Sequence, residues 1–347
     1  MENEESLEIS ELTLDELQAK EMKEKTKLQK ILDHVTCFLP IIVGFIAILE
    51  YKYVPNVPEF YNPKPNTYIT FLLMLMGIFF SLYVVSLFLK RKNFFNTVLH
   101  KAPLTAAVFA FLILYDCLTL KSNYLLYPFF PWFNDILNAM IGDAAFLLEC
   151  SLNTLKLLFY GYFSGVIVGL ITGIICGYSK KAEYWVDPLI KILGPIPTAT
   201  WIPLIMVIAS TLFKGCVFIV ALGVWFAVTT ATMTGIKSID KSYFEAAQNM
   251  GCDSKQLIFK IAIPAAVPNI FQGMTQGMSS ACVALMVAEM IGVESGLGWY
   301  IVWAKAWANY SKMYASIIII CIIFTVVTQT LAFIRRRVLR WQEGLVR

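Results

Sequence analysis

The sequence predicts an all-α membrane protein, a polytopic bundle of about eight transmembrane helices. The chain has 347 residues, of which 58% are hydrophobic and only 15% are charged, whereas an average soluble domain carries about 25% charged residues. Its mean hydropathy of +0.66 excludes a soluble globular protein and a disordered chain. With two histidines in the sequence, a membrane haem protein is nearly excluded, because such proteins need pairs of axial ligands inside the bundle.

Eight apolar stretches are each about long enough to cross roughly 30 Å of hydrocarbon. They cover approximately residues 36–54, 67–89, 103–121, 152–178, 187–210, 215–235, 266–292 and 313–334. Lysines and arginines gather in the segments that follow the second, fourth, sixth and eighth stretches. With eight spans, these four segments and the N-terminus share one side of the membrane. The positive-inside rule then places both termini in the cytoplasm.

These patterns divide the chain into four parts. Residues 1–33 are predicted to form a cytoplasmic N-terminal helix, and residues 34–121 hold the first three spans. Residues 122–150 are predicted to form an external loop, which is aromatic and broken by prolines. Residues 151–347 hold the other five spans.

Glycines and prolines mark two of the later spans. In the fourth span glycine recurs at every fourth position, which predicts a ridge that another helix can approach closely. The glycines of this ridge are Gly161, Gly165, Gly169, Gly173 and Gly177. The fifth span contains three prolines between Gly194 and Pro203. Each proline removes a backbone hydrogen bond, so this helix is predicted to bend or break.

The segment 236–264, between the sixth and seventh spans, is predicted to contain two short helices. Ser242 and Glu245 can form a capping box at the start of the first helix, and Asp240 is a second candidate for the cap. Gly251 suits the left-handed position that ends this helix.

The second short helix can be capped by Asp253 or Ser254. Pro264 stands where the chain is expected to re-enter the membrane. A helix-turn-helix held between two spans would offer a rigid surface to a cytoplasmic partner.

One set of residues in this segment follows the pattern of a known family. The set is Glu245, Ala246, Ala247, Gly251, Ile261, Ile263 and Pro264. Its spacing resembles the EAA loop of bacterial ABC importer permeases, with Ile263 in place of the usual leucine. Further residues resemble the nitrate/sulfonate/taurine branch of that family. They are Asp187-Pro188, Pro195-Ile196-Pro197, Trp201 to Leu204, Ala288-Glu289 and Ser295 to Gly298.

The resemblance covers about residues 150–342 and implies a type I ABC importer permease core, preceded by three extra N-terminal spans. It implies that the segment 236–264 is a coupling loop, which sits in a cleft of a cytoplasmic ATPase and transmits its motion. The residues assigned to this coupling are Glu245, Ala246, Ala247, Gly251, Ile261 and Pro264. The implied location is the bacterial inner (plasma) membrane, as a multi-pass protein.

The resemblance also implies the partners of the chain. They are two copies of the ATPase, an extracytoplasmic substrate-binding protein, a second copy of the permease, and membrane lipid; no nucleic acid is expected. The sequence lacks the phosphate-binding pattern G-x-x-x-x-G-K-[ST]. The chain is therefore expected to be no enzyme and to bind no cofactor or metal, with ATP and Mg held by the ATPase. The implied solute is a small anion such as nitrate, a sulfonate, taurine or bicarbonate, or a heterocyclic vitamin precursor.

Five residues are candidates for the translocation pathway. Glu289 is the only carboxylate in the seventh span, and it could serve the pathway or an outer gate, or form a structural interhelical hydrogen bond. Ser279 shares a helical face with Glu289. Gln272 and Gln276 could line the path or bridge helices. Trp201 could stack on a substrate ring or fill the core.

Two alternatives stay open beside these assignments. A secondary transporter or a channel not driven by ATP is the competing class, although no convincing inverted repeat relates the halves of the chain. Eight cysteines are scattered without a CxxC pair, which favours buried thiols over disulfides or a metal site. Asp116, in the third span and outside the resemblance, is expected to pair with another polar group.

Overall fold

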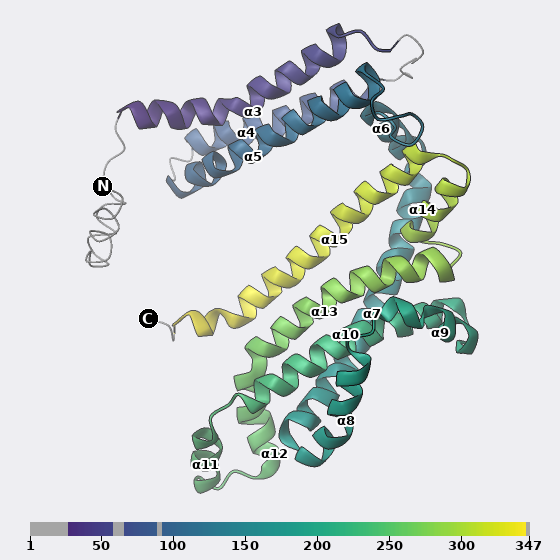
Figure 1. Ribbon diagram of the computed structural model, residues 1–347. Coiled ribbons are helices and arrows are strands. Elements are labelled where there is room, and N and C mark those ends of the chain that lie inside the picture. The colour runs from purple at the N-terminus through teal and green to yellow at the C-terminus, as the bar shows by residue number, and fades with distance from the viewer. Residues whose placement is uncertain (1–26, 58–65, 89–91, 345–347) are drawn as a thin grey trace, which may run out of the picture. The chain divides into compact units, whose positions relative to one another are not determined.

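The structure is a computed structural model that describes residues 27–57, 66–88 and 92–344 (Figure 1). These residues form helices and no strands, which confirms the all-α class. The chain divides into two compact units, Met1–Asn134 and Asp135–Arg347, and each is described by itself. Most of the predicted N-terminal helix of residues 1–33 lies outside the described residues.

The N-terminal unit is built from three long helices. They are α3 (Lys27–Tyr53), α4 (Thr67–Phe88) and α5 (Lys92–Asp116), which continues into a π-helical turn, η1 (Cys117–Lys121). Helix α3 packs mainly along α5, and α4 contacts both. All three are long and apolar enough to cross a membrane, as predicted.

The third span begins earlier than its predicted start at residue 103. Helix α5 runs through Pro103 without ending, so its apolar part extends from Phe94 to Lys121. The proline lies near the middle of α5, a long helix that packs against α3 and α4. Packing therefore overrides the tendency of proline to end a helix.

The second unit contains the remaining helices, and its boundary at Asn134/Asp135 falls inside the first of them. They are α6 (Phe133–Gly142), α7 (Ala144–Tyr178), α8 (Lys180–Leu193), η2 (Thr198–Trp201), α9 (Ile202–Ile208), α10 (Leu212–Lys237), α11 (Lys241–Asn249), α12 (Ser254–Gln256), η3 (Leu257–Ala262), α13 (Ile263–Gly292), α14 (Leu297–Ala306), α15 (Tyr310–Val338) and η4 (Leu339–Gly344). Helix α7 begins at Ala144, so the predicted boundary at residues 150/151 falls inside it. The helix begins before the predicted span of residues 152–178, because its first turns are also apolar. Leu147, in these turns, is buried against α14 and α15.

The glycine ridge of α7 lies directly against α10. A methyl group added to Gly165 would come within 2.6 Å of the carbonyl oxygen of Ala221, and one added to Gly161 within 2.5 Å of Val220. On the other side of α10, a methyl group on Gly273 of α13 would come within 2.5 Å of Ala231. Helix α10 is thus held tightly between α7 and α13, and these three helices carry the main core of the unit.

The predicted fifth span is a broken one. Helix α8 and the short helices η2 and α9 meet at a bend of 92°, where Pro195 and Pro197 interrupt the chain. The described residues hold seven helices that could cross a membrane, or eight if this bent pair forms one crossing.

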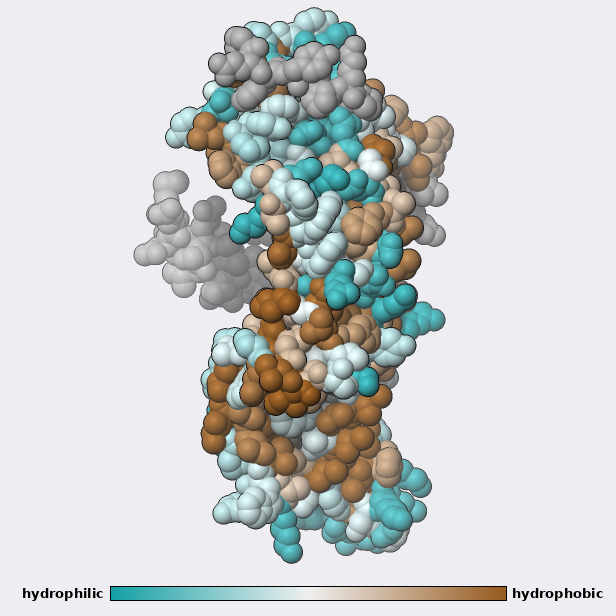
Figure 2. Space-filling view, turned by 90° about the vertical axis from the view of Figure 1, so that its right-hand side faces the viewer, coloured by the Kyte–Doolittle hydropathy of each residue, from teal (hydrophilic) through white to brown (hydrophobic). Residues whose placement is uncertain are grey.

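Large apolar side chains are exposed along the outer faces of the long helices, and hydrophobic residues cover wide areas of the surface in Figure 2. Examples are Phe111 at 63% exposure, Ile167 at 57% and Val326 at 58%. Such exposure is unfavourable in water but expected of helices that face lipid. The protein is therefore a multi-pass membrane protein.

Candidate functional site

The segment between α10 and α13 begins with helix α11, which is capped by Asp240. The carboxylate of Asp240 accepts a hydrogen bond of 2.9 Å from the backbone N–H of Ser242, and its hydrogen bonds with Ser242 lower the pKa of this carboxyl group. The predicted capping box of Ser242 with Glu245 is wrong, because Ser242 already lies inside the helix. The second candidate, Asp240, occupies the capping position.

Helix α11 ends at Gly251 as predicted. The φ angle of Gly251 is +83°, a left-handed conformation in which a side chain would be strained. The N–H of Gly251 donates to the carbonyl of Gln248 at 2.9 Å, and that of Cys252 donates to the carbonyl of Ala247 at 3.0 Å. This pair of bonds is a Schellman motif. It fixes the direction in which the chain leaves the helix.

The second predicted short helix is not a separate element. Asp253 does cap it, together with Gln256, but residues Ser254–Gly292 form one continuous helix that includes α12, η3 and α13. Pro264 lies at the first positions of α13, directly after the π-helical turn η3. This wider turn accommodates the proline without ending the helix. Pro264, where the chain is expected to re-enter the membrane, thus lies inside a continuous helix at a change of helical type.

The coupling residues predicted from the sequence occupy one end of the second unit (Figure 1). Glu245, Ala246, Gly251 and Pro264 are exposed, Ile261 is half-buried and Ala247 is buried. Around them Tyr243, Met250 and Phe259 expose 65%, 78% and 69% of their surface. A patch of small and large apolar groups at the end of a helical hairpin is typical of a protein interaction site.

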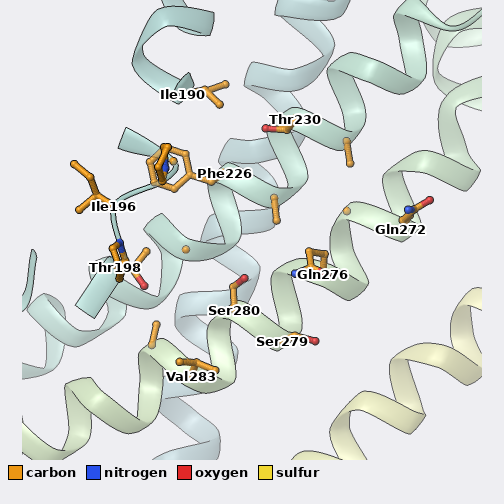
Figure 3. Close-up of a pocket in the computed structure, with 18 of the residues that line it drawn as sticks. Ile190, Ile196, Thr198, Phe226, Thr230, Gln272, Gln276, Ser279, Ser280 and Val283 are labelled. Atoms are coloured by element: carbon orange, nitrogen blue, oxygen red, sulfur yellow. The ribbon is translucent and has the colours of Figure 1, made fainter. Parts of the chain in front are cut away.

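A cavity of about 890 Å³ opens beside the break between α8 and α9 (Figure 3). Its walls come from the broken segment Gly194–Ala199, from α10 and from α13. The polar residues of its lining are Thr198, Thr230, Thr234, Asn269, Gln272, Gln276, Ser279 and Ser280. No residue of the lining is charged. A solute in this cavity would meet amide and hydroxyl groups beside the aromatic ring of Phe226.

Three of the five predicted pathway residues line this cavity, namely Gln272, Gln276 and Ser279. Trp201 does not, although it belongs to the same short helix η2 as the lining residue Thr198. Glu289 also lies outside the lining. Sequence reasoning missed the α10 wall of the cavity, because Thr230 and Thr234 resemble the ordinary polar residues of a packed helix.

Glu289 is buried at a junction of three helices, with only 1% of its surface exposed. Its Oε2 atom accepts a hydrogen bond from the hydroxyl of Thr154 in α7 at 3.1 Å and one from the backbone N–H of Gly298 in α14 at 2.9 Å. Thr154 in turn accepts a hydrogen bond from the N–H of Leu297 at 2.9 Å. Glu289 therefore forms an interhelical hydrogen bond in this structure.

Two glycines make room for the Glu289 carboxyl group. A methyl group on Gly296, whose φ angle is +139°, would come within 2.7 Å of the carboxyl carbon, and one on Gly298 would come within 2.7 Å of the Cβ atom of Glu289. Ala288-Glu289 and Ser295 to Gly298, two stretches that resemble the nitrate/sulfonate/taurine branch, therefore lie in contact with each other. We call this cluster the Glu289 clamp. It consists of Thr154, Glu289, Gly296, Leu297 and Gly298. Sequence reasoning missed Thr154, which lies 135 residues away from Glu289.

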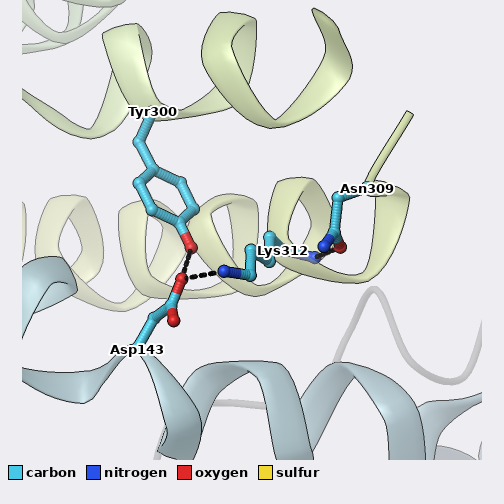
Figure 4. Close-up of polar contacts among 4 residues, drawn as sticks. All are labelled: Asp143, Tyr300, Asn309 and Lys312. Atoms are coloured by element: carbon cyan, nitrogen blue, oxygen red, sulfur yellow. Dashed lines mark hydrogen bonds and ion pairs between the residues drawn. The ribbon is translucent and has the colours of Figure 1, made fainter. Parts of the chain in front are cut away.

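A second polar cluster joins the start of α7 to α14 and α15 (Figure 4). One carboxylate oxygen of Asp143 accepts a hydrogen bond of 2.6 Å from the hydroxyl of Tyr300 and pairs with the ammonium of Lys312 at 2.6 Å. Burial alone would raise the pKa of Asp143, but the bonds from Lys312 and Tyr300 outweigh it and lower the pKa below its ordinary value. Asn309 caps α15 by accepting from the N–H of Lys312. The cluster is expected to fix α14 against α7.

Comparison with known proteins defines the class. Residues 165–340 match the family of binding-protein-dependent transport system inner membrane components, and the chain belongs to this family. Over 144 residues it is 27% identical to a putative ABC transporter permease of Methanocaldococcus jannaschii, covering 42% of this chain and 51% of that protein.

Other relatives carry more specific names. Over 107 residues the chain is 32% identical to a putative aliphatic sulfonates transport permease of Bacillus subtilis, covering 31% of this chain and 39% of that protein. Over 105 residues it is 26% identical to a taurine transport system permease of Escherichia coli, covering 30% and 38%. The chain thus spans about half or less of the length of these relatives.

Solved structures with a similar arrangement include the MetNI methionine ABC transporter in inward-facing conformations, at 19% identity and a TM-score of 0.49, covering 57% of this chain and 97% of that one. An amino acid ABC transporter with histidines matches at 21% identity and a TM-score of 0.48, covering 58% and 96%.

Proposed function

We propose that this chain is the membrane-spanning permease subunit of an ATP-driven ABC importer. It passes a small solute, delivered by an extracytoplasmic binding protein, into the cytoplasm. The observation that carries the proposal is helix α11, which is capped by Asp240, ended by Gly251 and flanked by the exposed side chains of Tyr243 and Met250. In a family of transport membrane components, such a rigid apolar projection is suited to a partner that drives movement.

In this proposal the projection docks into a cytoplasmic ATPase. Ala246 is small and exposed, so a partner surface can approach the helix closely at little cost in side-chain entropy. Glu245 is exposed beside it and is free to accept hydrogen bonds from a basic partner. Ile261 and Pro264 lie where the projection joins α13 and pass its displacement to the cavity wall. The ATPase binds the ATP and Mg, and two copies of it serve two copies of the permease.

The solute passes through the cavity lined by Gln272, Gln276 and Ser279. Relatives named for sulfonates, taurine, nitrate and bicarbonate support a small polar solute, either such an anion or a planar heterocycle. The uncharged lining supports a route that hydrogen-bonds the solute without holding it by an opposite charge. The protein then acts in a bacterial inner membrane with both termini and α11 in the cytoplasm. Glu289 serves the architecture of the route rather than its surface.

The competing function is a secondary transporter or channel that needs no ATP. The two functions are separated by purifying the tagged chain from its native membranes and reconstituting the purified sample in liposomes. We expect an ATPase subunit to co-purify and uptake to require ATP together with the binding protein. Uptake that follows an ion gradient without ATP would establish the competing function instead.

The coupling role is tested by replacing Gly251 with valine. A branched residue held at positive φ costs on the order of 1–2 kcal/mol or more, although a methyl group at this position would meet no atom within 4 Å. We expect Gly251→Val to remain in the membrane but to lose most of its ATPase co-purification or ATP-dependent uptake. Gly142→Val is the matched control, since Gly142 also faces open space and has no positive φ. Equal uptake by both variants would disprove the coupling assignment.

A further inference from the structure

A second cavity, of about 360 Å³, opens in the second unit, and we call it the end cavity. Its walls come from α7, from the start of α10 and from the short link between α13 and α14. Helix α10 begins at this cavity and ends just before α11. Because α10 has 26 residues, its two ends are separated by about 39 Å. The end cavity therefore lies at the end of the unit opposite to α11.

Two side chains of opposite charge line the end cavity. Lys156 on α7 and Glu294 in the link between α13 and α14 belong to its lining, and both are exposed. In the described part of the chain, no hydrogen bond or ion pair engages either of these charged groups. The lysine and the glutamate thus share one cavity without neutralising each other. Each is open to a ligand group of opposite charge.

A polar contact beside these charges holds the wall of the cavity together. The side-chain amide of Asn153 on α7 donates a hydrogen bond of 2.7 Å to the hydroxyl of Ser295 in the link. Both residues line the cavity and are half-buried, and they adjoin Thr154 and Gly296 of the Glu289 clamp. The carbonyl oxygen of the amide and the hydrogen of the hydroxyl are still available to a ligand.

The remaining lining is apolar. Leu157 is buried, and the ring of Phe213 packs edge-on against that of Tyr160, with 6.1 Å between the ring centroids. A single inorganic ion could pair with only one of the two charged side chains and would gain nothing from the apolar wall. Full complementarity requires an organic molecule that carries both charges and a short apolar part.

We propose that the end cavity binds a small zwitterion, a molecule with one acidic and one ammonium group joined by a short carbon chain. The acidic group pairs with Lys156 and the ammonium with Glu294, while the carbon chain lies on the apolar wall. A free amino acid and the headgroup of phosphatidylethanolamine share this chemistry. The inference goes beyond the proposed transport function, because binding here requires neither the ATPase nor the cavity of Figure 3.

Binding is measured by saturation-transfer NMR titrations on the purified full-length chain in nanodiscs of phosphatidylglycerol, a lipid without an ammonium group. The probes are β-alanine, which carries both charges, propanoate, which carries only the acid, and propylamine, which carries only the ammonium. We expect β-alanine to bind and each single-charge probe to bind on the order of tenfold more weakly, because one charge-assisted hydrogen bond is lost.

Substitutions identify the two charged groups. Lys156→Gln and Glu294→Gln should each weaken the binding of β-alanine by a similar factor. Lys214→Gln and Glu149→Gln are the matched controls and should bind β-alanine as the wild type does, since both side chains are exposed and lie outside the lining of the end cavity. Reversal of one charge gives a result that altered folding cannot produce. Glu294→Lys places two positive charges in the cavity and should bind the dicarboxylate succinate in preference to β-alanine.

The same titration in nanodiscs that contain phosphatidylethanolamine separates the two sources of the ligand. Loss of β-alanine binding in these nanodiscs identifies the lipid headgroup as the occupant, and unchanged binding identifies a free solute. Three results would overturn the proposal. They are no binding of β-alanine by the wild type in phosphatidylglycerol, binding of propanoate or propylamine as tight as that of β-alanine, and equal losses in the control variants and the site variants.

Discussion

A single buried carboxyl group joins three helices in the second unit. Glu289 receives hydrogen bonds from α7 and α14, and the glycines at 296 and 298 leave the space that it fills. Its importance was predictable, because an acidic residue within an apolar span is rarely accidental. Its role was not predictable, because the hydroxyl that binds it lies 135 residues away and no local pattern connects them.

The Glu289 clamp predicts a specific coupling between two substitutions. Gly296→Ala should destabilise the protein by on the order of 2 kcal/mol, because the new methyl group would come within 2.7 Å of the Glu289 carboxyl carbon in a backbone conformation that disfavours alanine. Glu289→Ala should cost a similar amount, since it leaves Thr154 and the Gly298 N–H unpaired. The double variant should be more stable than the sum of both losses implies.

This cycle is measured from melting temperatures of the purified variants in detergent. Gly77→Ala serves as a control, since a methyl group there would meet no atom within 4 Å. Strict additivity of the two losses would show that the glycine does not make room for the carboxyl group.

The cluster around Asp143 predicts that the stability of the second unit falls in acid. The bonds from Lys312 and Tyr300 lower the pKa of Asp143 in the folded protein. The stabilisation is therefore complete above the ordinary carboxyl pKa of about 4 and is lost as the pH falls through the lowered value. We expect Asp143→Asn to remove about 1 kcal/mol at neutral pH and to flatten the acid side of the stability curve. A steep acid transition that is unchanged in Asp143→Asn would contradict this assignment.

The packing face of α7 was predictable from the spacing of its small residues. The glycine ridge of α7 was visible as a repeat of four, and the structure places it against α10, as such a ridge requires. The partner helix could not be named from sequence, because a ridge fits any smooth helical surface. The cap of α11 was also ambiguous, since Ser242, Glu245 and Asp240 all fit a capping pattern and only the observed helix start at Lys241 decides between them.

The ridge predicts a strong contrast between two glycines. Gly165→Ala should lower stability by on the order of 2 kcal/mol or more, because the methyl group would come within 2.6 Å of the backbone oxygen of Ala221, and backbone cannot move aside as a side chain can. Gly77→Ala, in open space on α4, should cause no loss, since alanine is the better helix former. Thermal unfolding of both variants, with unchanged membrane insertion, tests the contrast. Equal stability would show that α7 and α10 are packed less closely.

At the scale of the whole molecule, hydropathy predicts nearly every long helix, and the prolines predict the bend in the fifth. Hydropathy cannot decide whether the bent pair α8 and α9 crosses the membrane, since its two halves leave the break at 92° to each other. The distribution of charge indicates whether the pair crosses the membrane. No charged residue lies between Ser122 and Trp132, whereas Lys255 and Lys260 follow α11. The positive-inside rule therefore separates these two segments by an odd number of crossings.

Cysteine accessibility should decide the number of crossings between these segments. Tyr124, which is 80% exposed, and Lys255 are replaced singly by cysteine. In the background the native thiols that are not buried, Cys117, Cys252 and Cys321, are changed to serine. Between the two positions lie α7, the bent pair and α10. If the bent pair crosses, a membrane-impermeant thiol reagent added to intact cells should label Tyr124→Cys and spare Lys255→Cys until the membrane is opened. Labelling of both from one side would mean two crossings, so that the pair would be a re-entrant loop and the two termini would lie on opposite sides.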